Sequence, residues 1–575
     1  MHSFFKKLPS LMGFSLSLLC APVFSHSHSS SSSSSKDSCH NCKCCIIYVD
    51  EKAHHDGDGL SWKHAFKDLQ SALEFAAITD GPNEIWVAKG TYTPTALNIS
   101  AWDAGYPPFS LAGTKPTFTI PHNTYLYGGF KGDECERYER NPEKHVTILS
   151  GDIDQNDKAL STRGGPGFPL KQNYLDSKLD NARHVVTIVN ADVTLDGFTI
   201  AKGFAGDLPN LVTDQTSNFL FRETMRGGGV LAKDSSLVLE NIIFDDCEAY
   251  DSQDLFGGIG GALFTLRTHL VMDKVKMTNG YAPYFGPAFV VVEGECSARH
   301  LKIENNEGRG CTSSLQDVRF DVTKSTFKNN VAEDFCGALQ VLQVNQEPTG
   351  HSSITKCTFE DNTGGVCASL DLINQSGLVM PEILVKNCKF ARNKALKLFE
   401  GNVSCGAICD YSYNALIVEN LFENNSGLTC GAICATQNDF SSPIETNVII
   451  KDSIFNANHQ VGMDSLGGGA IHFLTGVTGD ILQSSFHKNI SDTNGGAIAL
   501  ENARAFLKCN SFDSNSAALQ GAAIYSHCSV HNEISECNSF KSPSHDATVC
   551  ECAPLQPAST LKQAVAKRNN ALITP

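Results

Sequence analysis

Hydrophobic residues recur at every second position in short runs between residues 226 and 545. In the run AIAL they are Ile498 and Leu500, and in AIHF they are Ile471 and Phe473. This period of two, with Val, Ile and Phe inside the runs and Gly and Asn between them, predicts short β-strands joined by tight turns. No segment between the runs shows the periodicity of a helix.

The runs belong to a tandem repeat with two parts. The first part is Phe-x-x-Asn, which begins at Phe327, Phe359, Phe390, Phe422, Phe455, Phe486 and Phe512. The second part is a cluster of small residues such as CGAI or GGAI, which begins at Gly260, Cys336, Cys367, Cys405, Cys430, Gly468, Gly495 and Gly521. Tandem copies at this period are typical of solenoids. We therefore predict an all-β parallel β-helix with two or three short strands per repeat and a rise of about 4.8 Å per coil.

Two physical properties of asparagine could explain why it recurs in each Phe-x-x-Asn. Asn tolerates the left-handed backbone conformation that a turn between strands requires, and identical amides at strand spacing can hydrogen-bond one another as a ladder. A row of ligand-binding amides is the functional alternative. We predict a structural column of Asn330, Asn362, Asn393, Asn425, Asn458, Asn489 and Asn515. Small residues two positions before each Phe predict a second, inward column of Ser325, Cys357, Cys388, Asn420, Ser453, Ser484 and Asn510.

The N-terminal part of the repeat region has a different pattern. Residues 46–50 (IIYVD) and 84–92 (EIWVAKGTY) predict strands. Between them, residues 61–76 place Trp62, Phe66 and Leu69 with other apolar residues on one face of an amphipathic helix, with Ser61 as its N-cap. A helix here covers the open end of the first coil, which blocks pairing of the exposed strand edge.

The chain divides into six predicted segments. A basic start, an apolar run and VFS ending at Ser25 predict a cleaved export signal, and the serine run after it predicts a flexible linker. Residues 157–180 and 206–224 have the composition of loops inserted between coils. The segments are the signal peptide 1–25, the Ser/Cys-rich linker 26–45, the cap and first coils 46–155, the inserted loops and coil 156–225, the repeat β-helix 226–545 and the C-terminal tail 546–575.

Twenty-two cysteines indicate disulfide use in an exported protein. Removal of the signal leaves 21, and this odd number favours a free thiol or an intermolecular bridge. CHNCKCC could bind a metal through its Cys-x-x-Cys, but no second pair at zinc-site spacing accompanies it. Strand alternation predicts that Cys409 and Cys434 point outward on neighbouring coils. Our disulfide or cross-link candidates are Cys39, Cys42, Cys44, Cys45, Cys409, Cys434, Cys550 and Cys552.

Charge and candidate chemistry favour a protein without catalytic activity. The net charge of −17 argues against nucleic acid and anionic membranes as partners. GDIDQND, which holds Asp152, Asp154 and Asp157, lacks the glycine and the distal Glu of an EF-hand, so we interpret it as a solvated turn. No pair of carboxylates has the arrangement of a glycosidase. We predict no catalytic residue, no metal site and no cofactor.

Two resemblances add to this interpretation. IYVDE, GDGLSWKHAFKDLQSALEFA, EIWVAKGTY, YLYGGFKGDE and TILSGDI resemble the cap and first coils of exported bacterial right-handed parallel β-helix proteins. The GGA(I/L) and FxxN repeats with many cysteines are similar to the passenger region of chlamydial polymorphic membrane proteins. Together the resemblances cover about residues 46–545, and they imply a surface-exposed autotransporter passenger with roles in adhesion, virulence and a disulfide-linked envelope. Autotransporters end in a β-barrel, whereas this chain ends with APLQPASTLKQAVAKRNNALITP soon after the last repeat.

These observations lead to two functional hypotheses. The first is an exported, cysteine-rich β-helix of the cell surface or outer membrane, or a secreted one, that acts in adhesion or envelope structure. Its expected partners are a host-cell or envelope protein or glycan, with disulfide-linked self-association. The alternative is a secreted polysaccharide lyase or glycosidase on the same fold, a hypothesis supported by fold analogy alone.

Overall fold

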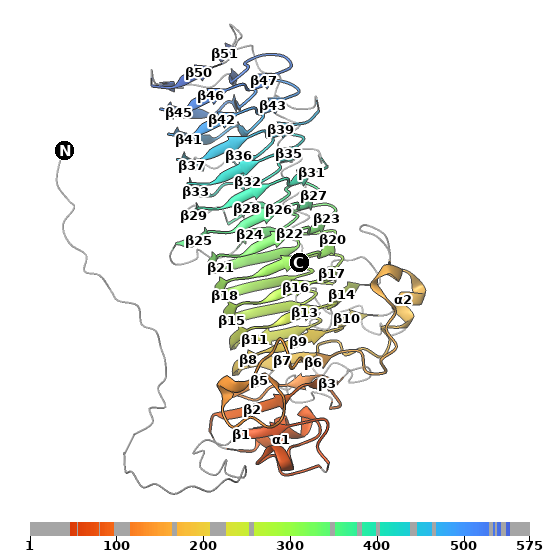
Figure 1. Ribbon diagram of the computed structural model, residues 1–575. Coiled ribbons are helices and arrows are strands. Elements are labelled where there is room, and N and C mark those ends of the chain that lie inside the picture. Colours follow the sequence, from red (N-terminus) through yellow and green to blue (C-terminus); the bar gives the residue numbers. More distant parts are fainter. Residues whose placement is uncertain are drawn as a thin grey trace, which may run out of the picture. The chain divides into compact units, whose positions relative to one another are not determined.

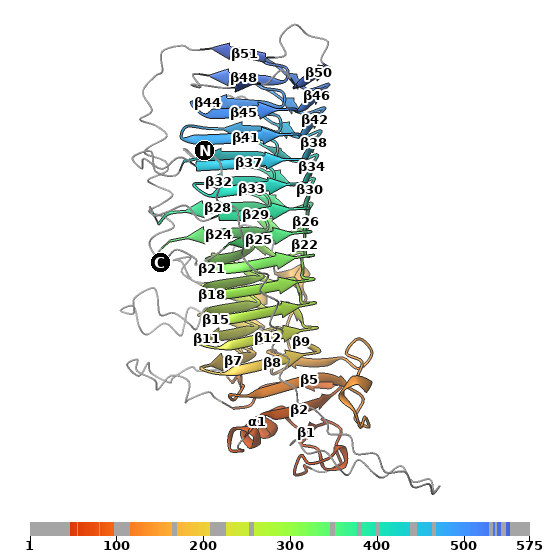
Figure 2. The same cartoon turned by 90° about the vertical axis from the view of Figure 1, so that its left-hand side faces the viewer.

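The alternating runs form short parallel strands that stack in register from coil to coil (Figures 1 and 2). The computed structural model describes residues 46–551 except 55, 80, 97–115, 164–169, 208–225, 252–257, 345–350, 377–381, 398–402, 438–445, 463–466, 528–532, 535–536 and 542–547. Within the described residues, the paired strands of the three sheets are parallel, for example at Ile433 with Ile471 and at Phe422 with Phe455. The chain is thus a parallel β-helix, which confirms the predicted fold class.

Three sheets form the walls of the helix. The largest contains β1 (Ile46–Val49), β2 (Asn83–Ala88), β4 (Phe118–Thr119), β5 (Thr124–Phe130), β7 (Val186–Val189), β8 (Asp192–Asp196), β11 (Val230–Lys233), β12 (Ser236–Glu240), β15 (Leu263–Asp273), β18 (Phe289–Arg299), β21 (Ser313–Thr323), β24 (Leu339–Gln343), β25 (Ser352–Thr355), β28 (Leu370–Asn374), β29 (Glu382–Lys386), β32 (Ile408–Tyr411), β33 (Asn414–Val418), β36 (Ile433–Thr436), β37 (Thr446–Lys451), β40 (Ile471–Phe473), β41 (Val477–Leu482), β44 (Ile498–Glu501), β45 (Arg504–Lys508), β48 (Ile524–His527), β49 (Glu533–Ile534) and β51 (Thr548–Glu551).

The second sheet contains β3 (Gly90–Tyr92), β6 (Thr147–Ser150), β9 (Phe198–Ala201), β13 (Ile243–Asp245), β16 (Lys276–Thr278), β19 (Lys302–Glu304), β22 (Thr326–Lys328), β26 (Thr358–Glu360), β30 (Lys389–Ala391), β34 (Leu421–Glu423), β38 (Ile454–Asn456), β42 (Ser485–His487), β46 (Ser511–Asp513) and β50 (Ser539–Lys541). The third contains β10 (Phe204–Asp207), β14 (Glu248–Asp251), β17 (Tyr281–Ala282), β20 (Glu307–Gly308), β23 (Val331–Ala332), β27 (Thr363–Gly364), β31 (Lys394–Ala395), β35 (Ser426–Gly427), β39 (His459–Gln460), β43 (Ile490–Ser491) and β47 (Ser516–Ala517).

A single repeat supplies more strands than the sequence predicted. The coil that begins at Ile433 holds four, β36 to β39, because the chain turns within the largest sheet as well as between sheets. In β15 and β21 the two segments of this sheet are still one strand of 11 residues, and a left-handed residue, Arg267 or Asp317, marks the bend.

A phenylalanine stack fills the interior behind the second sheet. Rings from Phe327 to Phe540 lie one per coil, with neighbouring centroids 4.7 to 5.0 Å apart and nearly parallel planes. The rings from Phe327 to Phe512 belong to the main core, a single buried cluster that extends from Ile47 to Ile524. Stacked identical rings fix the register, since a slip of one residue would move each ring out of the core.

The asparagine column is a continuous, buried hydrogen-bond ladder. Asn393 donates from its backbone N–H and its Nδ2 to Oδ1 of Asn425, at 3.1 and 2.9 Å. Asn425 does the same to Asn458, and the pattern extends to Asn515. The left-handed residue is the one before each ladder asparagine, such as Asn329 or Asn424. Of the two reasons considered, only the amide ladder therefore applies to these positions.

The small-residue cluster marks a place where the backbones of neighbouring coils lie in close contact. A Cβ on Gly406 would lie 2.3 Å from the carbonyl oxygen of Gly431, and one on Gly431 would lie 2.0 Å from that of Gly469. A glycine at this position therefore lets the backbone of one coil lie against the next.

The capping helix is shorter than predicted. Ser61 caps a 3-10 helix over Trp62–His64, and the α-helix α1 spans Leu69–Ala77 with Asp68 as its N-cap. The prediction of one helix from Ser61 was wrong because Phe66 is extended and exchanges backbone hydrogen bonds with Tyr48 and Asp50. Leu69, Leu73 and Ala76 of α1 are buried in the main core at the end of the stack (Figure 2).

Short helices also lie outside the coils. A 3-10 helix spans Arg137–Glu139, another spans Leu160–Thr162, and α2 spans Gln172–Asp176. The last two belong to the segment predicted as an inserted loop, which lies beside β10, β14 and β17 (Figure 1).

Candidate functional site

A shallow groove follows the corner between the largest and the second sheet. It has a volume of about 400 Å³ and crosses four consecutive coils. Charged side chains line it, including Lys356, Lys389, Glu419 and Asp452. Because the groove follows the same corner from coil to coil, it forms an elongated contact surface along the stack.

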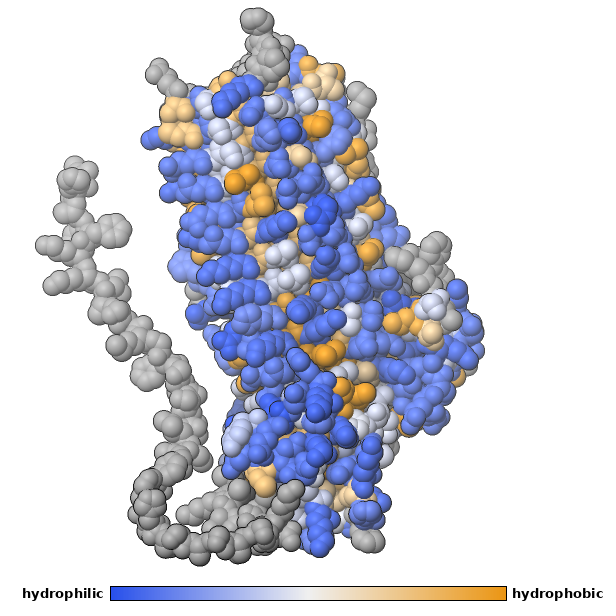
Figure 3. All heavy atoms as spheres, viewed as in Figure 1, coloured by the Kyte–Doolittle hydropathy of each residue, from blue (hydrophilic) through white to orange (hydrophobic). Residues whose placement is uncertain are grey.

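Apolar side chains flank this corner on two neighbouring coils. Leu416 pairs in register with Ile449, and Leu421 pairs with Ile454. Leu416, Ile449 and Ile454 are 40%, 39% and 49% exposed. Figure 3 shows apolar and neutral side chains that run along the stack between hydrophilic columns. Grouped exposed apolar residues with a polar rim are typical of interaction sites.

A buried ion network holds the inserted segment against the third sheet. Arg163 forms ion pairs with Glu248 at 2.9 Å and with Glu307 at 3.0 Å, and the hydroxyl of Tyr174 donates to Glu248 at 2.8 Å. Arg163 is 6% exposed and Glu248 is fully buried. This network combines acidic and basic side chains with a tyrosine. Because these groups are buried, they fit a role in anchoring the inserted segment to the coils better than contact with a polysaccharide.

A second part of the network corrects the interpretation of GDIDQND. Lys178 pairs with Asp157 at 2.9 Å and with Asp246 at 3.5 Å, and Asp152 pairs with Lys202 at 2.7 Å. Asp152 is 2% exposed and the side chain of Asp157 is 1% exposed. Asp152 and Asp157 are therefore buried ion-pair partners, not residues of a solvated turn.

This network predicts a pH dependence of stability. Burial and the nearby charge of Glu248 raise the pKa of Asp246 to about 7. Because the folded state then binds this proton more tightly than the unfolded state, the contribution of Asp246 to stability is fully present below about pH 4 and is lost as the pH rises through about 7. We expect Asp246→Asn to reduce this fall, measured as urea midpoints over that range. Equal slopes in both proteins would contradict the assignment.

The predicted cysteine pair lies in register, but it is buried. Cys409 and Cys434 are Cα partners on β32 and β36. Both are fully buried and carry free thiols. The expectation that they face outward as cross-link candidates was therefore wrong, because this face of the strands is covered and forms a second apolar cluster with Tyr411, Val403 and Leu474.

Seven thiols in this second cluster form what we call the cysteine cluster. Its members are Cys311, Cys336, Cys367, Cys405, Cys409, Cys430 and Cys434. Sγ of Cys405 lies 3.1 Å from Sγ of Cys430, and the thiol of Cys409 interacts with those of Cys367 and Cys405. Burial raises the pKa of the Cys367, Cys409 and Cys430 thiols well above its ordinary value. Without a metal, these thiols are poor nucleophiles.

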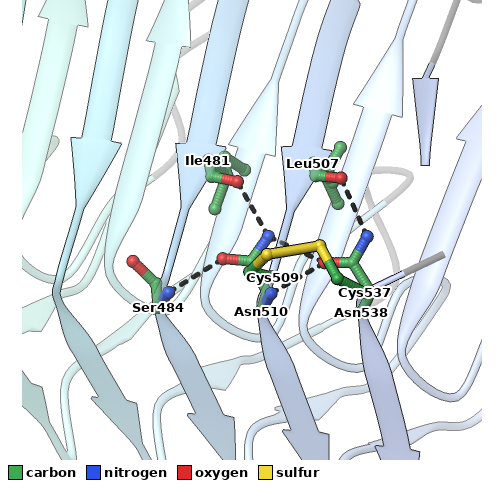
Figure 4. Close-up of a disulfide and its surroundings, with 7 residues drawn as sticks. All are labelled: Ile481, Ser484, Leu507, Cys509, Asn510, Cys537 and Asn538. Atoms are coloured by element: carbon green, nitrogen blue, oxygen red, sulfur yellow. Dashed lines mark hydrogen bonds between the residues drawn. A yellow bond between two sulfur atoms is a disulfide. The ribbon is translucent and has the colours of Figure 1, made fainter. Parts of the chain in front are cut away.

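Of the other cysteine candidates, the structure describes only Cys550. Cys39, Cys42, Cys44, Cys45 and Cys552 lie outside the described residues, and Cys550 belongs to β51. The sequence missed a disulfide between Cys509 and Cys537, whose Cα atoms lie 4.6 Å apart on the last coils (Figure 4). Beside it, Asn510 donates to Asn538 Oδ1 from both its backbone N–H and its Nδ2. Cys135 is also disulfide-bonded.

Two structural features of this region were not predicted from the sequence. Asp371 stands four residues after Cys367, as Cys409 stands four after Cys405, and these positions pair in register. An alignment of the CGAI clusters at the fourth following position, which yields Gln340, Asp371, Cys409, Cys434 and His472, would have revealed this column. The ion pairs of the inserted segment left no such signal, because their partners lie 85 and 144 residues apart.

The fold and its stacked ladders define a solenoid of the parallel β-helix class. No protein-family model matches the chain, and no curated protein matches it. The surface adhesin PfbA of Streptococcus pneumoniae is similar at 11% identity and a TM-score of 0.29, over 85% of this chain and 91% of that one. An A-module of a mannuronan C-5 epimerase from Azotobacter vinelandii is similar at 13% identity and a TM-score of 0.23, over 88% and 100%.

A further structure shows the same level of similarity. The family 28 exopolygalacturonase of Yersinia enterocolitica has 11% identity and a TM-score of 0.26, over 89% of this chain and 78% of that one. Within the described part of the chain, no helix has the length and apolar character that a membrane span requires.

Proposed function

We propose that this protein is an exported β-helix of the cell surface or outer envelope that acts in adhesion or envelope structure. The observation that carries the proposal is the outer face of the stack. There the corner groove and the exposed Leu416, Ile449 and Ile454 combine charged and apolar groups over successive coils. A host-cell or envelope protein or glycan is the partner that such an extended surface fits.

The chemistry of the cysteines supports a cross-linked envelope component. The 11 free cysteines of the described residues are all buried, so none of them is accessible to a second molecule without unfolding. Intermolecular bridges would therefore come from those of Cys39, Cys42, Cys44, Cys45, Cys550 and Cys552 that are not bonded to Cys135.

A non-reducing gel of fractionated producing cells, run beside a reduced lane, tests this proposal. We expect high-mass species in the envelope fraction that collapse to one band with reductant. Serine at Cys39, Cys42, Cys44 and Cys45 should diminish those species, whereas Cys296→Ser, a matched change of a buried cysteine, should leave them intact. A soluble monomer with unchanged mobility would contradict the structural function, and activity on a polyuronate panel would then favour the enzyme.

The adhesive part has its own test. Beads coated with the mature chain are scored for attachment to cultured epithelial cells. The double variant Leu416→Glu, Ile449→Glu should reduce attachment severalfold, since it places charges on the exposed apolar pair without entering the core. Ser516→Glu, an exposed position on β47 of the third sheet, serves as the control. Equal attachment of both variants would contradict adhesion through this face.

A further inference from the structure

Four side chains with metal-binding atoms occupy the corners of one small rectangle in the cysteine cluster. Cys367 pairs with Cys405 on the neighbouring coil through an isolated parallel bridge. Four residues further along the chain on each coil, Asp371 of β28 pairs with Cys409 of β32. The register of two neighbouring coils therefore brings these four side chains together.

The distances suit one ion. A ligand atom of each of Cys367, Asp371 and Cys409 lies within 4.8 Å of the other two. Tetrahedral zinc holds sulfur ligands at about 2.3 Å, which places neighbouring sulfur atoms about 3.8 Å apart. Side-chain rotations that move the ligand atoms by about 1 Å would shorten the present separations to this spacing. The thiol of Cys405, which interacts with that of Cys409, can supply the fourth ligand.

Burial and charge also indicate a cation. Cys367, Cys405 and Cys409 are fully buried, and so is Asp371. A buried carboxyl group beside thiols carries a large desolvation cost that a bound cation offsets.

We propose that Cys367, Asp371 and Cys409, with Cys405 as the fourth ligand, bind one thiophilic divalent cation of the zinc type. Thiolate ligands select such an ion over calcium or magnesium, which prefer oxygen. Because the ligands come from two coils, the ion ties β28 to β32, and binding is coupled to the stacking of those coils. This inference does not depend on the proposed surface function.

Cobalt substitution of the full chain tests the proposal. The protein is purified with a thiol reductant, stripped of metal and titrated with Co²⁺, and Zn²⁺ is then used as competitor. We expect one Co²⁺ per chain, with thiolate charge-transfer and tetrahedral d–d bands that Zn²⁺ abolishes. The double variant Cys367→Ser, Cys409→Ser should lose the bands, and Asp371→Asn should weaken binding at least about tenfold.

Cys296→Ser is the matched control, because Cys296 is a buried free cysteine of the main core outside the cysteine cluster. It should bind Co²⁺ as the unchanged chain does. The proposal is overturned if the reduced chain shows no thiolate–cobalt band, or if the double variant keeps the band. It is also overturned if the chain forms a Cys405–Cys430 disulfide and binds no metal after reduction.

A measurement on the unchanged chain covers the case in which the variants do not fold. The chain is alkylated in urea below its unfolding midpoint, with and without Zn²⁺, and the modified cysteines are mapped by mass spectrometry. Zn²⁺ should slow modification of Cys367 and Cys409 at least about tenfold relative to Cys296. Equal protection of all three thiols would mean that the ion does not bind at this site.

Discussion

Phe422→Ala is expected to destabilise the β-helix by about 3–5 kcal/mol, the usual cost of removing a fully buried aromatic side chain. The Phe422 ring lies between Phe390 at 5.0 Å and Phe455 at 4.7 Å. Its loss leaves a cavity in the stack and removes two ring contacts. Because each coil of a solenoid contacts only its neighbours, the damage should concentrate on the coils around β34.

Urea unfolding followed by circular dichroism measures the total effect, and hydrogen exchange with mass spectrometry locates it. Phe540→Ala is the matched control, since Phe540 ends the stack, is 36% exposed and contacts one ring, Phe512. We expect it to cost less than half as much. Similar losses for both variants would contradict the view that the interior of the stack carries the stability.

Asn425→Leu is expected to cost about 3–5 kcal/mol, although Leu has a similar volume. The side chain of Asn425 donates to Asn458 Oδ1 and to the carbonyl of Phe390, and it accepts two hydrogen bonds from Asn393. Leu would leave the groups on Phe390 and Asn393 buried without partners, and each such group costs about 1–3 kcal/mol.

The same urea and hydrogen-exchange measurements apply to this variant. Asn447→Leu provides the control, because Asn447 lies on the exposed face of β37 on the next coil. A surface change of this kind usually stays within about 0.5 kcal/mol. If Asn425→Leu were equally mild, the ladder would contribute little to folding.

The sequence alone predicts much of this fold because a solenoid repeats one contact many times. Phe390, Phe422 and Phe455 stand at nearly equal intervals, so the residue that each one meets is its own copy in the next coil. The same holds for the asparagine column. Periodicity therefore determined the register and the interior, without knowledge of contacts between unlike residues.

The candidate sites are a different case. Strand alternation placed Cys409 and Cys434 on the face opposite the main core, but only the structure shows that this face is covered and buried. The register of two neighbouring coils places Asp371 beside Cys367 and Cys409.

Two further features depended on tertiary contacts alone. Phe66 pairs with the first strand, and this contact ended the predicted helix before Leu69. Arg163 meets Glu248 because an insert folds back onto the coils. The sequence by itself determined the repeat, the stacks and the class of fold, since these arise from identical residues at a fixed period. The tertiary structure decided which outward residues are buried and which unlike residues meet, because those contacts join segments whose separation follows no period.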